Sequence, residues 1–66
     1  MCIFERIKTK SLLAKYGKSA NTNDAIVFLE TLNLNSKDKE WIKCVVKKYY
    51  NSDDATILLL FLEVLD

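Results

Sequence analysis

Histidine, the side chain that most often serves as a general base or acid near neutral pH, does not occur in this chain. Acid–base catalysis would therefore need a carboxylate, lysine, tyrosine or cysteine with a strongly shifted pKa. Asp53 and Asp54 are adjacent, but neighbouring residues of a helix point about 100° apart. Their position directly after Ser52 favours a structural role, in which two carboxylates stabilise the positive end of a helix dipole. We expect no catalytic residues and no enzymatic activity.

Metal and cofactor sites are also not expected from this set of residues. A structural zinc site uses four Cys or His ligands, and the chain has two Cys. A calcium loop counted from Ser52 fails at Thr56 and Ile57, where a ligand and a glycine are needed. Gly17 is the single glycine, so no glycine-rich phosphate loop can form. The sequence therefore predicts neither a metal site nor a cofactor site.

The two thiols are expected to be reduced. Charged residues interrupt the first ten positions, so no secretory signal is expected and the chain is assigned to the cytosol. Cys44 lies between Lys43 and Val45 at the edge of an apolar pattern, and we expect it to be buried and unreactive. Cys2 has no lipidation context.

Size and charge limit the class of protein. The 66 residues are enough for one domain, and a domain this small has a thin stability margin. Half of the residues are apolar and the net charge is +1, which argues against disorder and against a general polyanion binder. Cations concentrate in residues 1–18 and anions in residues 51–66, which gives a basic head and an acidic tail. Self-association or a partner is the expected source of further stability.

Asn and Ser take the place of proline and glycine as the breaks between segments, and these breaks predict an all-α bundle. Four helices are expected, at residues 3–16, 23–33, 37–50 and 53–65. Gly17 suits a left-handed position after the first helix. The expected N-terminal caps of the other three are Thr22 or Asn23, Ser36 and Ser52.

Apolar periodicity supports the segments to different degrees. The third has a stripe made of Trp41, Ile42, Val45, Val46 and Tyr49. The second has a stripe made of Ala25, Phe28, Leu29 and Leu32. In the first, the apolar patch at residues 3–7 is displaced around the axis from the patch at residues 12–16, which predicts a kink or break near residues 9–11.

The last segment is apolar on all sides between Ile57 and Leu62, so it must be surrounded by protein or lipid. It is about half as long as a membrane span requires. Three short helices can cover such a helix only in part, which predicts a homodimer or another protein partner with the fourth helix at the centre of the core or interface. The expected interface residues are Tyr16, Tyr50, Leu58, Leu59, Phe61 and Leu62. Among the tyrosines, Tyr50 is expected to be partly exposed.

Nucleic-acid binding is the alternative. Residues 12–32 resemble a helix-turn-helix, but the expected turn spans about six residues where three or four are typical. The second helix also carries Asp24 and Glu30 and has no cation. A sequence-tolerant contact with phosphates through the third helix is the remaining form of this hypothesis. The residues expected to make it are Lys39, Lys43, Lys47 and Lys48.

These observations predict a small, non-enzymatic regulator or inhibitor that binds another protein through an apolar helical surface, of the kind that bacteria and phages encode as accessory proteins.

Overall fold

The helical prediction is confirmed. The computed structural model describes residues 2–65. These residues form four helices: α1 (Ile3–Lys18), α2 (Thr22–Glu30), α3 (Ser36–Tyr49) and α4 (Ser52–Val64). The largest boundary difference is at the end of α2, which stops three residues before the predicted position.

Asparagine caps the last three helices, one residue before the predicted Ser or Thr in each case. The side-chain oxygens of Asn21, Asn35 and Asn51 accept hydrogen bonds from the backbone N–H groups of the aspartates three residues later. Two of these asparagines also donate from Nδ2 to the same aspartate, to Asp24 at 2.6 Å and to Asp54 at 2.9 Å. In this Asn-x-x-Asp pattern the asparagine satisfies one backbone donor that the first turn leaves free. The return bond differs from that of a capping box, because the aspartate accepts from the side-chain amide and not from the backbone N–H of the cap residue.

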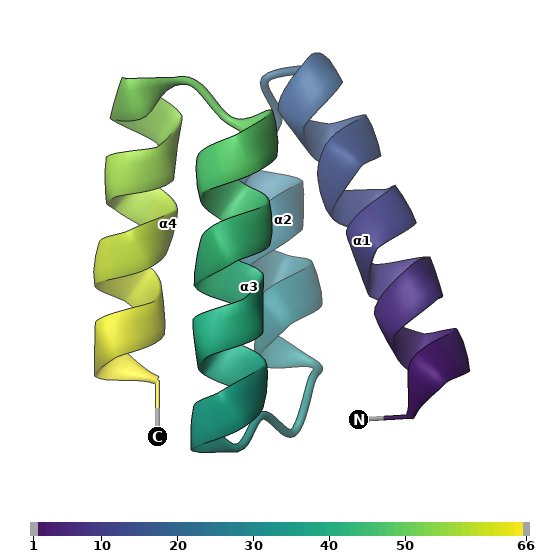
Figure 1. Cartoon of the computed structure of the whole chain (residues 1–66). Coiled ribbons are helices and arrows are strands. Elements are labelled where there is room, and N and C mark those ends of the chain that lie inside the picture. The colour runs from purple at the N-terminus through teal and green to yellow at the C-terminus, as the bar shows by residue number, and fades with distance from the viewer. Residues whose placement is uncertain (1, 66) are drawn as a thin grey trace.

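The predicted kink in α1 is wrong, because α1 is one uninterrupted helix (Figure 1). Its second apolar patch contributes buried Leu13 to the core. Its first patch faces solvent, with Phe4 80% exposed. The two patches therefore lie on different sides of a continuous helix, and no bend is needed to bring both onto the core.

Gly17 is not in the left-handed conformation that the sequence suggested. It lies inside α1, and the left-handed residue of this connection is Ala20, with φ 54°. The lack of a side chain at Gly17 serves another purpose. A Cβ there would lie 2.7 Å from the backbone oxygen of Tyr49, so the glycine allows α1 and α3 to approach closely.

The helices pack so that each one contacts two others. α1 and α4 each contact both α2 and α3, whereas α1 does not contact α4 and α2 does not contact α3 within residues 2–65. α1 and α4 therefore lie on opposite sides of the bundle (Figure 1). The core between them is apolar. Its fully buried larger side chains are Leu13, Leu29, Ile42, Val46, Leu58 and Leu62.

This arrangement decides one part of the expectation about α4. The sequence suggested a helix at the centre of the core or interface, and α4 is not at the centre of the core, because α2 and α3 cover it within residues 2–65 and one side of it faces solvent. Its inner face is the buried one, with Ala55, Leu58 and Leu62.

A buried carboxylate joins α1 to α3. Asp38 is 2% exposed and lies 3.6 Å from the guanidinium of Arg6 on α1. Arg6 also lies over the ring of Trp41, 5.4 Å from its centroid. The guanidinium thus bridges a carboxylate and an aromatic face of α3, which fixes the N-terminal half of α1 against that helix.

Candidate functional site

The outer face of α4 carries a row of exposed apolar side chains. Ile57, Leu60 and Val64 are 48%, 63% and 82% exposed, respectively. Their spacing of three and four residues places them along one side of the helix, opposite the buried face. We call these three residues the α4 stripe. A continuous apolar row on a folded domain of this size is typical of a protein-binding surface.

The structure divides the predicted interface residues of α4 between core and margin. Leu58 and Leu62 are fully buried inside the domain, so they hold α4 on the bundle and do not face a partner. Leu59 and Phe61 are half-buried and flank the buried face. Sequence reasoning missed the α4 stripe, because a helix that is apolar in every direction gives no sign of which side its neighbours cover.

Both predicted tyrosines pack against the core. Tyr16 is half-buried, with its ring 6.4 Å from that of Phe28. The expectation that Tyr50 is partly exposed is wrong, since it is 7% exposed. Its hydroxyl has no hydrogen-bond partner among residues 2–65. Burial, with smaller contributions from Tyr16 and Asp54, raises the pKa of Tyr50 to about 12.

A groove of about 410 Å³ runs between α3 and α4 beside the α4 stripe. Lys43 crosses it and forms ion pairs with Glu63 at 2.6 Å and with Glu40 at 3.3 Å. The hydrogen bond between Lys43 and Glu63 raises the pKa of the lysine and lowers that of the carboxyl group. Lys47 lines the same groove next to Thr56. The side of the α4 stripe that faces α3 is thus bordered by both lysines and glutamates.

The four lysines proposed for nucleic-acid contact do not form one free basic face. Lys39 donates a hydrogen bond from Nζ to the backbone oxygen of Leu65, and Lys43 is paired with Glu63. Lys48 lies over the ring of Tyr49, 5.5 Å from its centroid, on the side of α3 that lines a different groove. Two of the four lysines thus attach α3 to α4, and the other two lie apart.

A second exposed apolar cluster, which sequence reasoning also missed, lies on α1. It consists of Ile3, Phe4 and Ile7, which are between 64% and 80% exposed. We call these residues the α1 cluster. The sequence signal for this cluster is the displacement of the patch around the helix axis, which indicates a separate exposed side of α1 and not a kink.

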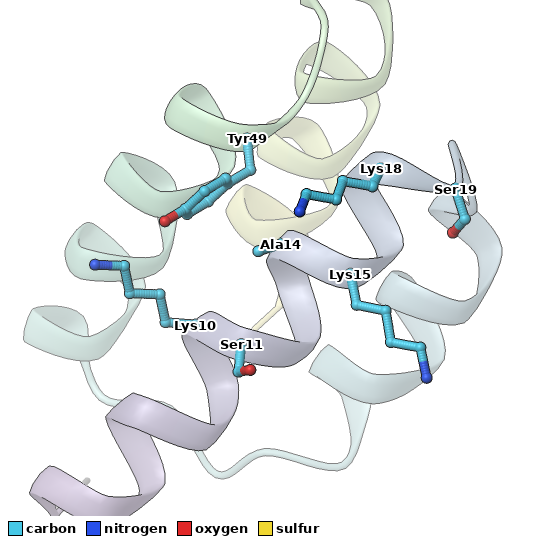
Figure 2. A pocket seen from close by; sticks show the side chains of 7 residues that line it. All are labelled: Lys10, Ser11, Ala14, Lys15, Lys18, Ser19 and Tyr49. Atoms are coloured by element: carbon cyan, nitrogen blue, oxygen red, sulfur yellow. The ribbon is translucent and has the colours of Figure 1, made fainter.

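A hollow of about 660 Å³ lies between α1 and α3 (Figure 2). We call it the basic groove. It is lined by Lys10, Ser11, Ala14, Lys15, Lys18, Ser19 and Tyr49. These residues come from the second half of α1, the turn after it, and the end of α3. Neither the predicted interface nor the predicted lysine face includes this groove.

One argument against a helix-turn-helix fails in the structure. The turn between α1 and α2 has three residues, 19–21, which is a typical length for that motif. The charge argument stands, because Asp24 and Glu30 on α2 are both exposed and would repel phosphates.

We also searched the described residues for metal-binding clusters, membrane-spanning helices and buried thiols. Within residues 2–65, no group of three or more Cys, Asp or Glu side chains could hold a metal ion, and no helix is long and apolar enough to cross a membrane. The expectation that Cys44 is buried is wrong, because both Cys2 and Cys44 are exposed. Cys44 points away from the core that its neighbours Val45 and Val46 enter.

Comparisons with protein-family models, with curated proteins and with solved structures found no match to this chain. The candidate function therefore depends on the surfaces described above.

Proposed function

We propose that this chain is a non-enzymatic protein-binding regulator or inhibitor that works as a homodimer in the cytosol, with the α4 stripe as the dimer interface. The exposure of Ile57, Leu60 and Val64 on one side of α4 is the observation that carries this proposal. Burying these side chains against another apolar surface would remove them from water, which favours association. Leu59 and Phe61, half-buried beside the α4 stripe, would extend the contact.

A second copy of the chain fits this surface because of its charged margin. In an antiparallel pairing of two α4 helices, with a twofold axis at Leu60, the Thr56 end of one helix lies beside the Glu63 end of the other. The α3 helices of both copies then lie on the same side of the pair. Lys47, which lines the groove next to Thr56, would face Glu63 of the second copy. The symmetry repeats this contact, so the interface is self-complementary in shape and charge.

The α1 cluster is proposed to bind the regulated protein. α1 and α4 lie on opposite sides of the bundle, so pairing through α4 leaves Ile3, Phe4 and Ile7 exposed in both copies. A dimer would then present two identical apolar surfaces. The alternative of phosphate contacts along α3 has less support, because Lys39 and Lys43 are already engaged by residues of α4.

The first experiment measures the solution mass of the wild type and of Leu60→Asp over a concentration series. Leu60 is exposed within the domain, so the aspartate should not disturb the core, and circular dichroism checks that the variant is folded. Val27→Asp is the matched control, because Val27 is 60% exposed on α2 and lies outside the α4 stripe. We expect the wild type and Val27→Asp to be dimers and Leu60→Asp to be a folded monomer. A monomeric wild type, or a dimeric Leu60→Asp, contradicts the proposal.

A charge exchange tests the antiparallel register. Lys47→Glu alone and Glu63→Lys alone each place like charges opposite one another twice in a homodimer, so each should dimerise weakly. An equal mixture of the two variants restores both opposite-charge contacts in the mixed dimer. We expect the mixture to associate more tightly than either variant alone. Equal association in all three samples would show that the register is wrong, even if a dimer forms.

A further inference from the structure

The basic groove has a different chemical character from the surfaces used above. We propose that it binds single-stranded nucleic acid, with its lysines contacting phosphates and Tyr49 stacking on a base. This inference goes beyond the proposed function, because the groove lies between α1 and α3, away from the α4 stripe. Figure 2 shows Tyr49 extending from α3 toward α1, where Lys10 and Lys18 lie on either side of it.

The cations of the groove are available for a ligand. Within residues 2–65, the ion pairs are those of Arg6 with Asp38 and of Lys43 with two glutamates, and none involves a lysine of the groove. Lys10 and Lys18 lie beside Tyr49, whereas Lys15 extends from the other side of α1 at the margin of the groove (Figure 2). Among the described residues that line the groove, none is Asp or Glu. Lys48, over the ring of Tyr49, adds a fourth cation at the margin. Such a concentration of unpaired lysines attracts phosphate groups.

The floor of the groove is shaped by small residues. Ser11 and Ala14 lie one turn apart on the side of α1 that lines the groove. Gly17, one turn further along, lets the two helices approach closely where they cross. An extended chain would therefore lie along the surface of the groove, over these small residues and next to the lysines. Ser11 adds a hydroxyl donor, whereas the hydroxyl of Ser19 already donates to the backbone oxygen of Tyr16.

The aromatic wall favours single-stranded nucleic acid over other anionic polymers. Tyr49 is half-buried and lines the groove with its ring, over which Lys48 lies, so a ligand base stacks there by displacing the Lys48 ammonium group. A duplex holds its bases inside the stack, where a ring inside a groove does not reach them. An acidic peptide would meet the lysines but would leave the stacking surface unused. Lysine ammonium groups are ordinary partners of phosphates.

The test measures binding of a labelled oligothymidylate of about twelve nucleotides by fluorescence anisotropy, from about 50 to 200 mM salt. With three or four phosphate contacts, the logarithm of the affinity should fall with the logarithm of salt with a slope of about −2 to −3. The double variant Lys10→Gln, Lys18→Gln should bind at least tenfold more weakly, with the slope reduced by about 1.4. Lys37→Gln, an exposed lysine at the start of α3, is the matched control and should bind like the wild type.

The role of Tyr49 is tested separately. Tyr49→Phe keeps a ring and should bind like the wild type, whereas Tyr49→Leu should weaken binding several-fold and leave the salt slope unchanged. Circular dichroism checks the fold of each variant, since Tyr49 also packs against the core.

Three results would overturn the inference. One is no binding at the lowest salt concentration. Another is binding that survives the double lysine variant but is lost in Lys39→Gln, Lys47→Gln, which would place the contact on the other side of α3. The third is polyglutamate binding as tightly as the oligonucleotide with the same lysine dependence, which would make an acidic protein segment the ligand. Leu60→Asp, included as a separate sample, distinguishes failure of this inference from failure of the dimer.

Discussion

Gly17→Ala is the substitution for which the sequence and the structure predict opposite results. Gly17 lies within the last turn of α1 and does not have a positive φ, so helix propensity alone predicts that alanine stabilises the domain by about 0.5–1 kcal/mol. In the structure, the added Cβ would lie 2.7 Å from the backbone oxygen and 3.3 Å from the backbone carbon of Tyr49. These atoms belong to the backbone of α3 and cannot rotate away. The two helices must therefore move apart.

The expected cost follows from that overlap. Forcing an extra methyl group into a closely packed contact costs about 1–3 kcal/mol. Subtracting the gain in helix propensity leaves a net loss of about 0–2.5 kcal/mol in the free energy of unfolding, centred near 1 kcal/mol. For a domain of this size, each kcal/mol changes the melting temperature by about 4–8 °C, so the central value corresponds to a melting temperature lowered by about 4–8 °C in Gly17→Ala.

Urea and thermal unfolding followed by circular dichroism measure this loss. Lys18→Ala is the control, because Lys18 is the exposed next residue of the same helix and its truncation should change the stability little. A Gly17→Ala variant that is more stable than the wild type would refute the reasoning. It would mean that α1 and α3 do not cross closely at this residue.

Three further substitutions test other features of the fold by the same unfolding measurements. Ala20→Gly should raise the free energy of unfolding by about 0.5–1 kcal/mol, because Ala20 is left-handed and a glycine has no Cβ to strain there. Tyr50→Phe should raise it by about 1 kcal/mol at neutral pH, because it removes a buried hydroxyl without a hydrogen-bond partner. Burial raises the pKa of Tyr50 from 10.0 to about 12 in the folded state, so the hydroxyl ionises more easily in the unfolded chain. The free energy of unfolding of the wild type is therefore independent of this ionisation below pH 10 and falls by up to about 2 kcal/mol as the pH rises to 12. Tyr50→Phe should not show this loss. Asp38→Asn should lower the stability by about 1–3 kcal/mol, because it removes the charge that pairs with Arg6 in a buried position. Little change in that variant would contradict a structural role for the pair.

The sequence predicted the helices well because their signals are local. The apolar stripe of α3 appears in the structure as buried Ile42, Val45 and Val46, and the stripe of α2 as buried Ala25 and Leu29. The spacing of apolar residues in the sequence predicts which residues are buried where a helix has one apolar side and one polar side.

The caps were each misplaced by one residue for a physical reason. Asn, Ser and Thr all accept a backbone N–H at a helix start, and Asn directly precedes Thr or Ser at all three sites. The repeated Asn-x-x-Asp spacing distinguishes them, because the aspartate can accept in return from the asparagine amide. The repeat Asn-x-x-Asp at residues 21–24, 35–38 and 51–54 is the sequence signal that identifies asparagine as the cap.

The candidate binding surfaces could not be predicted in the same way, because they are formed by residues that are distant in the sequence. Lys43 appears to belong to a solvated lysine row, yet its partner Glu63 lies 20 residues further on and is brought close by the antiparallel packing of α3 and α4. The groove lysines of α1 depend in the same way on Tyr49, which reaches them through the close crossing at Gly17. Surface chemistry in this fold is set by which helices are neighbours, whereas helix formation is set within each segment.

The order of packing also separates the two proposed activities. α1 and α4 do not contact each other within residues 2–65. The basic groove lies between α1 and α3, and the α4 stripe lies on the outer side of α4. A dimer through α4 would therefore leave both grooves open, on the outer sides of the assembly. Two grooves on one particle bind one strand with a higher effective concentration than two separate copies, provided that the strand spans them. Dimerisation and nucleic-acid binding would then support each other without sharing a residue. A substitution in the α4 stripe that prevents dimerisation leaves each groove intact, so it should weaken binding only to strands long enough to span both grooves.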